Sequence, residues 1–378
     1  MKKILLGTSA LVAAGLVGAQ AQAADPIKLS LSGWVSSVFV FGGQSHTPDR
    51  FDTVKWDGEI HFSGETKLDN GIKVGVQVEL EAYTEKRNGT LAGDQIDEHF
   101  MWFEGEFGRV EVGATNGPGN KLHVFIPSVM PSHGVDTPDY FHFATPSWSS
   151  AALYSTAPSD LRDLEDANKI SYFSPKFGPF RFGISYTPEF QPGLNGNSCG
   201  ATGGFGGQYG VCTKNNPGQW QHAVEGGGRF DFDLNGVAIA WSFGGMYANT
   251  EVRGDGYTDY LRFASGLSVT FGNFTIGGAY RWTNSGYQGK YDNVMFGLGG
   301  TYTSGPWGFS LAWAQVRDQD GGHGNKTDVL NLVDGGVVYN LGPGVDMFAG
   351  AQWARFSGDS DGPQSSGVKG YVGTKLTF

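Results

Sequence analysis

The sequence predicts an all-β fold, a 16-stranded antiparallel β-barrel that crosses a membrane and folds one long loop inward. Three observations predict it. About sixteen segments alternate apolar and polar residues, their connections alternate between short and long, and the final strand ends on an aromatic residue. If the apolar faces contact lipid, the strands must close into a barrel, because an open sheet edge in hydrocarbon leaves backbone groups unpaired.

The composition fits strands better than helices. Hydrophobic residues make up only 39% of the chain, charged residues only 17%, and 61 residues are glycine. Alternating strands dilute their apolar residues in this way, and glycine fits turns and crowded positions of a barrel wall. After the amino-terminal segment the sequence has no run of about 18 apolar residues, so it predicts no transmembrane helix.

Residues 1–23 have the organisation of a secretory signal peptide, which leaves residues 24–378 as the mature barrel domain. Lys2 and Lys3 form the charged region, and Ala21-Gln22-Ala23 is the cleavage motif. Removing these two lysines changes the formal net charge from -11 to -13. Nucleic acid is therefore not an expected partner, because phosphate binding needs a basic face.

The first two predicted strands, residues 27–43 and 53–68, alternate clearly. In the second of them, Val54 and Trp56 stand on one face, and the other face is charged. That charged face would contact solvent in a soluble sheet and would line a wet lumen in a barrel, so alternation alone does not choose between them. Asp69-Asn70-Gly71 then predicts a tight turn into the third strand.

The next hairpin, residues 99–106 and 109–115, has one ambiguous strand. Phe100 and Trp102 stand on the same face as acidic residues, and further large apolar residues stand on the opposite face. A face covered by a neighbouring subunit, or a β-bulge, would explain apolar residues on both sides.

Ten later strands form regular hairpins, with tight turns such as Asn235-Gly236 at one end and longer loops at the other. The last strand, residues 368–378, is expected to pair back to the first and close the barrel. The third strand and these ten are residues 72–81, 169–176, 180–188, 220–234, 237–249, 257–271, 274–283, 291–303, 307–317, 328–341 and 345–357.

Residues 116–166 lose the alternation and contain six prolines. A segment of this length without periodicity is uncommon inside a compact domain unless it has a function. An aqueous barrel interior has room for such a segment. We therefore expect residues 116–166 to fold inward and constrict the channel.

Cys199 and Cys212 lie in one Gly/Asn-rich stretch of a long loop, residues 189–218. In an exported chain, two nearby cysteines predict a disulfide. A metal site built on two cysteines is the weaker interpretation, because no histidine stands beside them at ligand spacing. The sequence predicts no metal centre and no cofactor.

Several motifs carry a family resemblance: Gly64-Glu65-Thr66, the hairpin around Phe107-Gly108-Arg109, Asn116-Gly117-Pro118, the run from Ile170 to Pro175, and terminal Phe378. In these the chain resembles the general porins of Gram-negative outer membranes, closest in style to those of alphaproteobacteria. The resemblance implies a homotrimer, surrounded by outer-membrane lipid and lipopolysaccharide, that passes small hydrophilic solutes past an inward-folded third loop. It also implies that Phe378 marks the C-terminal strand for the barrel-assembly machinery.

Such porins often set acidic loop residues opposite a basic cluster on the wall. Opposed charges across a narrow wet passage orient dipolar solutes, and the acidic mature chain predicts a mild cation preference. Ala114-Thr115 stand where relatives often carry an Arg-Gln pair, so a dense arginine ladder is not expected. The loop candidates are Asp136, Asp139, Asp160, Asp163, Glu165 and Asp166, and the wall candidates, chosen by strand parity, are Lys55, Lys73, Arg109, Arg181, Arg229, Arg262 and Arg281.

Three alternatives stay open. A solute-selective outer-membrane channel would need aromatic or charged residues along its constriction, to which Tyr140, Phe141 and Phe143 could contribute. An outer-membrane barrel enzyme such as a lipase would need a serine and histidine pair, although neither H-E-x-x-H nor G-x-S-x-G occurs and no catalytic residue is expected. A secreted soluble β-sandwich that binds glycans would explain alternating strands without a membrane.

Overall fold

A computed structural model of the chain describes residues 26–47, 49–82, 86–87, 90–91, 96–136, 142–147, 159–164, 167–190, 217–254, 256–289, 291–320, 326–358 and 362–378. The predicted signal peptide, Cys199 and Cys212, and the loop candidates Asp139, Glu165 and Asp166 lie outside the described residues. Within those ranges, no helix is long and apolar enough to cross a membrane.

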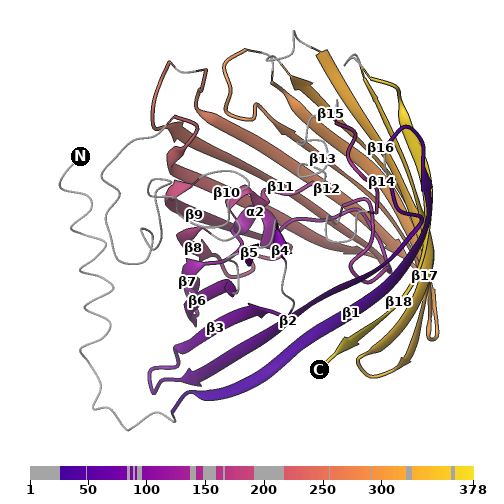
Figure 1. Cartoon of the computed structure of the whole chain (residues 1–378). Helices are drawn as coiled ribbons and strands as arrows, with labels where there is room; N and C mark the ends of the chain where they lie inside the picture. Colours follow the sequence, from indigo (N-terminus) through magenta and orange to yellow (C-terminus); the bar gives the residue numbers. More distant parts are fainter. Residues whose placement is uncertain are drawn as a thin grey trace.

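Sixteen antiparallel strands close into one barrel in the described part of the chain, which confirms the predicted fold. Figure 1 shows them as a continuous curved wall. A short two-stranded pair, β4 (Lys86–Arg87) and β5 (Thr90–Leu91), lies outside the barrel sheet, and a short helix, α2 (Pro118–Lys121), follows β7. The barrel strands are β1 (Lys28–Gln44), β2 (Asp52–Lys67), β3 (Lys73–Glu81), β6 (Ile96–Gly105), β7 (Gly108–Ala114), β8 (Asn168–Phe173), β9 (Phe180–Phe190), β10 (Trp220–Leu234), β11 (Val237–Thr250), β12 (Tyr260–Phe271), β13 (Phe274–Thr283), β14 (Asn293–Ser304), β15 (Trp307–Asp320), β16 (Lys326–Gly342), β17 (Val345–Gly358) and β18 (Ser365–Thr377).

The seam of the barrel joins its first and last strands. β1 pairs with β18 from Trp34, opposite Thr377, to Gln44, opposite Gly367. The terminal residue completes the seam, because Gly33 N donates to Phe378 O at 2.9 Å and Phe378 N donates to Gly33 O at 3.0 Å. With the ring closed, its strands can cross an apolar layer while their backbone groups stay paired.

The outer face of the barrel exposes large apolar side chains. On β2, Val54 is 69% exposed and Trp56 is 51% exposed, whereas Lys55 between them is half-buried on the inner face. On β1, Leu29 and Leu31 are exposed in the same way. An apolar surface that continues around the wall suits lipid rather than water. Together with the closed ring, it leaves no support for a soluble β-sandwich.

The ambiguous strand of the sequence is β6, and its aromatic residues point inward. Phe100 and Trp102 are each 8% exposed. Lys121 Nζ lies 4.7 Å from the centre of the Phe100 ring, and Arg109 Cζ lies 4.3 Å from the Trp102 ring. Inner cations therefore cover these rings. The pairing of β6 with β3 also shifts register between Val78 and Leu80, an irregularity of the kind expected from the ambiguous alternation of the sequence.

The turn between β10 and β11 has the geometry that its sequence predicts. Asn235 and Gly236 have φ angles of 55° and 86°. Positive φ at both central residues is the requirement of a type I′ turn, whose twist matches that of the flanking strands.

This turn gives a stability prediction. The substitution Gly236→Ala should lower the free energy of unfolding by about 1 kcal/mol, because an L side chain is strained at positive φ. Urea unfolding in detergent micelles, followed by tryptophan fluorescence, measures the change. Gly342→Ala is the matched control, since both glycines have open space around them but only Gly236 has a positive φ. An equal loss in both variants would contradict this account of the turn.

Candidate functional site

The long segment that follows β7 runs along the inner wall, across strands β9 to β16. One or two glycines of each of these strands lie directly beneath it. We call this set the glycine track. The glycine track consists of Gly183 (β9), Gly227 (β10), Gly244 (β11), Gly266 (β12), Gly277 (β13), Gly297 and Gly299 (β14), Gly308 (β15) and Gly336 (β16).

The glycine track lets the segment lie against the backbone of the wall. A methyl carbon added at Gly266 would lie 1.7 Å from the carbonyl oxygen of Val124, and one at Gly227 would lie 2.6 Å from that of Pro118. Contacts this short are not tolerated between carbon and oxygen. Only glycine permits so close an approach, so the track fixes the path of the segment.

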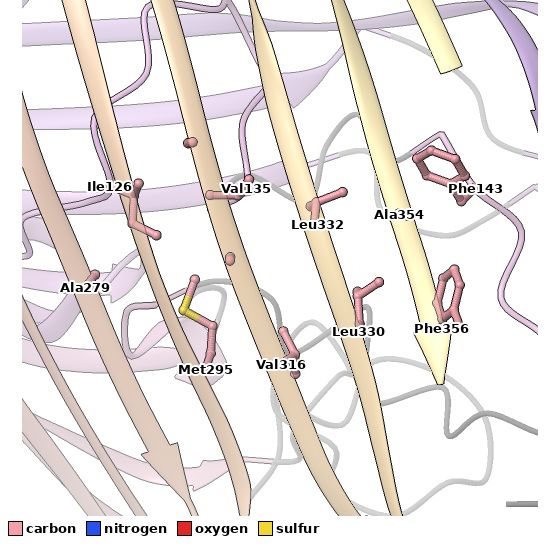
Figure 2. Close-up of a cluster of buried hydrophobic side chains, with 12 residues drawn as sticks. Ile126, Val135, Phe143, Ala279, Met295, Val316, Leu330, Leu332, Ala354 and Phe356 are labelled. Carbon is pink, nitrogen blue, oxygen red and sulfur yellow. The ribbon is translucent and has the colours of Figure 1, made fainter. Parts of the chain in front are cut away.

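The wall beneath the middle of the segment is apolar. Ile126, Val135 and Phe143 of the segment are buried in one cluster with side chains of β13 to β17, among them Leu330 and Phe356 (Figure 2). A fully buried side chain of this kind stabilises a fold by roughly 1.5–3 kcal/mol. The cluster therefore holds the segment to the wall, and Phe143 does not line a passage.

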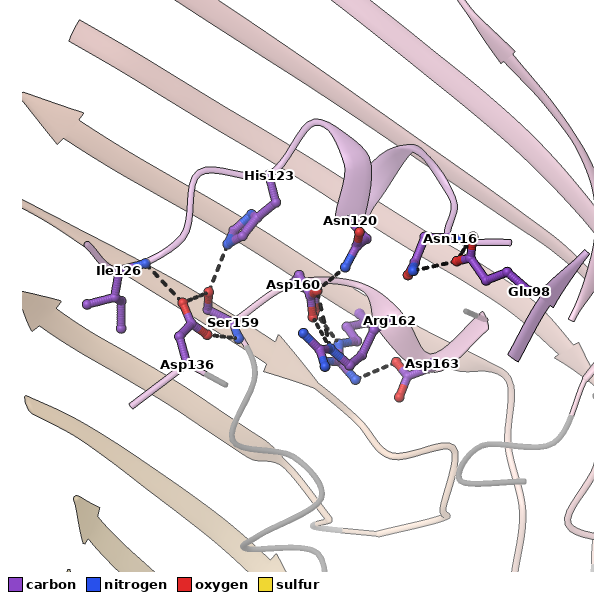
Figure 3. A network of polar contacts seen from close by, with 11 residues as sticks. Glu98, Asn116, Asn120, His123, Ile126, Asp136, Ser159, Asp160, Arg162 and Asp163 are labelled. Carbon is purple, nitrogen blue, oxygen red and sulfur yellow. Dashed lines mark hydrogen bonds and ion pairs between the residues drawn. The ribbon is translucent and has the colours of Figure 1, made fainter. Parts of the chain in front are cut away.

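Polar contacts tie down the beginning of the segment. The Glu98 carboxylate of β6 accepts hydrogen bonds from Thr115 Oγ1 at 2.7 Å and from Asn116 N at 2.9 Å and Nδ2 at 2.8 Å (Figure 3). On the other side, Gly119 N donates to Glu225 of β10. The turn of α2 is thus clamped between two buried carboxyl groups.

Asp160 and Asp163 anchor the segment through hydrogen bonds and an ion pair (Figure 3). Asp160 is 0% exposed, and its carboxylate accepts from Asn120 Nδ2 at 2.5 Å and from Arg162 Nε at 3.2 Å. Arg262 of β12 donates to the Asp160 carbonyl at 3.0 Å and pairs with Asp163 at 2.5 Å. Burial alone would raise the pKa of Asp160, but the Arg162 and Arg262 guanidinium groups outweigh it and lower that pKa.

Asp136 joins three parts of the segment. Its carboxylate accepts from Ile126 N at 3.0 Å, from Ser159 Oγ at 2.7 Å and from Ser159 N at 2.6 Å (Figure 3). Burial raises the pKa of Asp136 above its ordinary value, against these hydrogen bonds. The expectation that Asp136 and Asp160 face the passage is therefore wrong, because the folded segment encloses both side chains.

The wall cations do not form one open cluster among the described residues. Arg262 and Arg281 are 2% and 0% exposed, because the segment covers them. Arg229 pairs with Asp231 at 2.9 Å. The four other wall candidates are Lys55, half-buried on β2; Lys73, exposed at the start of β3; and Arg109 and Arg181, which line a cavity beside α2.

Two further carboxylates lie across the ring from the segment, Glu59, which is partly exposed, and Glu79, which is buried. β2 and β3 are eight strands from β12 and β13 in the ring of sixteen, so they face the covered half of the wall. Here Glu59, His61 and Glu79 form what we call the acidic wall. His61 Nε2 lies 2.9 Å from Glu59 Oε2 and 3.7 Å from Glu79 Oε2.

The acidic wall could offer three metal ligand atoms within 4.8 Å of one another. Those atoms already contact each other, and Trp34 Nε1 donates to Glu59 Oε2 at 3.2 Å. Nothing in the arrangement requires a metal.

Among the described residues of the segment, cations are more exposed than carboxylates. Lys121 and Arg162 keep 27% and 24% of their side-chain surface exposed. The expected arrangement, an acidic loop opposite a basic wall, is thus not seen in the described residues. The two-residue alternation of β2 predicts that Glu59 and His61 point inward. No local sequence pattern shows which strands of the barrel the segment will contact and which it will face from across the interior.

Two histidines lie together near the seam of the barrel. His133 Nδ1 donates to the Pro131 carbonyl at 2.7 Å, so its Nε2 accepts from His142 Nε2, 3.2 Å away. The His133 ring stacks on Tyr371 of β18, with the ring centres 4.2 Å apart. Burial lowers the pKa of His133 to about 4 and, with the charge of Lys55, that of His142 to about 2.

The sequence of residues 7–359 matches the family model of Gram-negative porins. This chain belongs to the Gram-negative porin family. The porin is therefore an outer-membrane channel, and the alternative of a barrel lipase receives no support. No curated protein matches its sequence.

Solved structures of other outer-membrane barrels share the fold of this porin. The anion-selective porin from Comamonas acidovorans is 16% identical with a TM-score of 0.60, covering 93% of this chain and 100% of its own. Salmonella typhi OmpF in complex with daunomycin is 15% identical with a TM-score of 0.63, covering 93% and 98%. Vibrio cholerae OmpT in its trimer form is 12% identical with a TM-score of 0.58, covering 94% and 100%. Identities this low show a common architecture alone.

The glycine track can be tested with one methyl group. Gly266→Ala should destabilise the porin by roughly 1–3 kcal/mol, because the added carbon collides with the Val124 carbonyl and lifts the segment. Urea unfolding in micelles measures the loss, and faster tryptic cleavage after Lys121 reports the displaced segment. Gly226→Ala is the control, since its methyl group would meet nothing nearer than 3.8 Å. If the two variants are cleaved at the same rate, the track does not position the segment.

The buried histidines predict a loss of stability in acid. The pKa of His133 is lowered from 6.5 to about 4, so the folded state resists protonation. The stability that His133 contributes is complete above pH 6.5 and is lost as the pH falls toward 4. Between pH 7 and pH 4, we expect His133 alone to lower the free energy of unfolding by about 1–3 kcal/mol.

The substitution His133→Phe isolates the contribution of His133 to the pH dependence of stability, because phenylalanine keeps the stacking on Tyr371 and takes up no proton. Unfolding free energies of native protein and variant at pH 7 and pH 4 give the comparison. His222→Phe removes an exposed imidazole and should leave the pH dependence unchanged. Identical pH dependence in native protein and His133→Phe would refute the assignment.

Proposed function

We propose that this porin is a passive diffusion channel for small hydrophilic solutes and ions, with a mild preference for cations. The proposal rests on the acidic wall, which lies on the opposite side of the barrel interior from the fixed inner segment. A barrel of sixteen strands leaves an aqueous channel rather than a core filled by side chains.

Residues 116–166 would act as the constriction of this channel. The glycine track spans eight of the sixteen strands, so the segment narrows the interior from one side. Buried carboxyl groups and the apolar cluster keep it in place. A fixed constriction suits diffusion limited by the size and charge of the solute.

The balance of open charges supports cation preference. Lys121 and Arg162 on the segment are each paired, with Glu111 at 2.5 Å and with Asp160 at 3.2 Å. The acidic wall has two carboxylates and a single imidazole for compensation. A passage with an excess of one charge concentrates the opposite ion, and the mature chain as a whole is acidic.

Individual lining residues follow from this arrangement. We propose that Lys55, Arg109, Arg181 and Arg229 contact the aqueous interior and that Asp163 stands at its margin, 14% exposed beside Arg262. Lys73 would lie at the opening of the channel on the side where tight turns join the strands. Asp139, Glu165 and Asp166 remain candidates for the constriction.

The assembly of the porin is part of the same proposal. A homotrimer is supported by the trimer form of the similar Vibrio cholerae OmpT. Outer-membrane lipid and lipopolysaccharide would surround the apolar outer face, and the barrel-assembly machinery would engage the C-terminal strand with Phe378. Residues 1–23 would be removed on export, and Cys199 and Cys212 would form a disulfide in the oxidising periplasm.

A channel selective for one solute is less favoured. It would need aromatic or charged side chains along the constriction, and of the aromatic candidates Phe143 is 7% exposed inside the apolar cluster. Tyr140 and Phe141 lie outside the described residues.

Planar-bilayer recording tests the proposed function. Purified porin should give stable conductance steps, arriving in threes, and a reversal potential in a KCl gradient that indicates cation preference. Replacing the carboxylates in Glu59→Gln/Glu79→Gln should lower the cation-to-anion permeability ratio about twofold, because negative charge is removed from the inner wall.

Asp69→Asn removes one negative charge from an exposed turn and serves as the control, with no change expected. Absence of conductance from correctly folded protein would overturn the channel proposal. Clear anion preference in the native protein would overturn the proposed selectivity.

A further inference from the structure

A cavity of about 360 Å³ lies between β7, α2 and β9, at the turn end of the barrel. This volume is in the range of pockets that hold small molecules. Its lining combines charged groups with an apolar side made by Leu122, Phe173 and Pro175. The acidic wall is not part of it.

The charges in this cavity do not balance. Its lining contains three cations, Arg109, Lys121 and Arg181, and two carboxylates, Glu104 and Glu111. Glu111 is 3% exposed and is shared by Arg109 Nε at 2.7 Å and Lys121 Nζ at 2.5 Å. Glu104 lies 3.4 Å from Arg109 Nη1. The two carboxylates are therefore used by Arg109 and Lys121.

Arg181 is the cation that remains. Its Nε is shielded from solvent and has no hydrogen-bond acceptor among the described residues. It stands directly opposite Arg229 in the pairing of β9 and β10, and like charges in that position are destabilising. Arg229 has Asp231 at 2.9 Å as its counter-ion. A guanidinium N–H donor that is shielded from water and has no acceptor can bind an anion from outside the chain.

We propose that this cavity binds the carboxylate of a small organic anion during its passage, with Arg181 as the partner of the carboxylate. The planar guanidinium fork matches a carboxylate through two parallel hydrogen bonds. One uncompensated positive charge suits a monoanion, and Leu122, Phe173 and Pro175 suit an apolar body attached to it. The proposal deepens the proposed diffusion function, since the open interior supplies access to the cavity.

Isothermal titration calorimetry of the full-length porin in non-ionic detergent tests the site, with benzoate as the probe in low-salt buffer. Arg181→Gln should weaken benzoate binding about tenfold or more, because a charge-assisted bidentate contact is lost. Arg181→Lys keeps the charge without the fork and should give an intermediate affinity. Arg253→Gln is the control, since Arg253 is 75% exposed in an external loop and pairs with Asp259.

Two further probes test whether the cavity recognises the charge of the ligand and its carboxylate group. Benzylamine has the same apolar ring with a positive charge and should not bind. Inorganic phosphate should bind more weakly than benzoate. Equal benzoate affinity in native porin and Arg181→Gln, or equal binding of benzylamine, overturns the site. Tighter binding of phosphate overturns the assignment to organic carboxylates.

Binding in micelles does not depend on conductance, so failure of this site and failure of the channel proposal are measured separately. Arg181→Lys also keeps the test decisive if Arg181→Gln does not fold. In that case, unchanged benzoate affinity in the lysine variant overturns the role of the guanidinium fork.

Discussion

The packing of one long segment against half of the inner wall is the interaction on which this porin depends. Strand pairing alone would close a ring of sixteen strands around an uncovered interior, part of which is apolar. The segment covers that apolar part and approaches the wall closely along the glycine track. Charges expected to line a pore, such as Arg262 and Asp163, form an ion pair because the segment covers Arg262.

Strands and their faces were predictable because their signal is local. A period of two residues places Val54 outside and Lys55 inside whatever the rest of the chain does. The Asn235-Gly236 turn is equally local, since it depends on two residues that accept positive φ. The register at the seam follows once the outer faces of the first and last strands must both meet lipid.

The candidate site was less predictable because its contacts join distant parts of the chain. Arg262 contacts Asp160 across 102 positions of sequence, and no pattern near either residue announces the other. Parity gave the correct inward direction for Arg262, but it could not show that the segment would cover it. The high glycine content was a visible signal, yet the glycine track becomes recognisable only when eight strands are aligned side by side.

The seam formed with Phe378 has a consequence for biogenesis. Because Phe378 supplies backbone bonds to Gly33, the barrel closes only when the first and the last strand, far apart in the sequence, meet. During export the two outermost strands, β1 and β18, have no partner on one side, and unpaired edges invite association with other chains. These borders need shielding until both strands meet, and loss of Phe378 would remove the two backbone hydrogen bonds that it shares with Gly33.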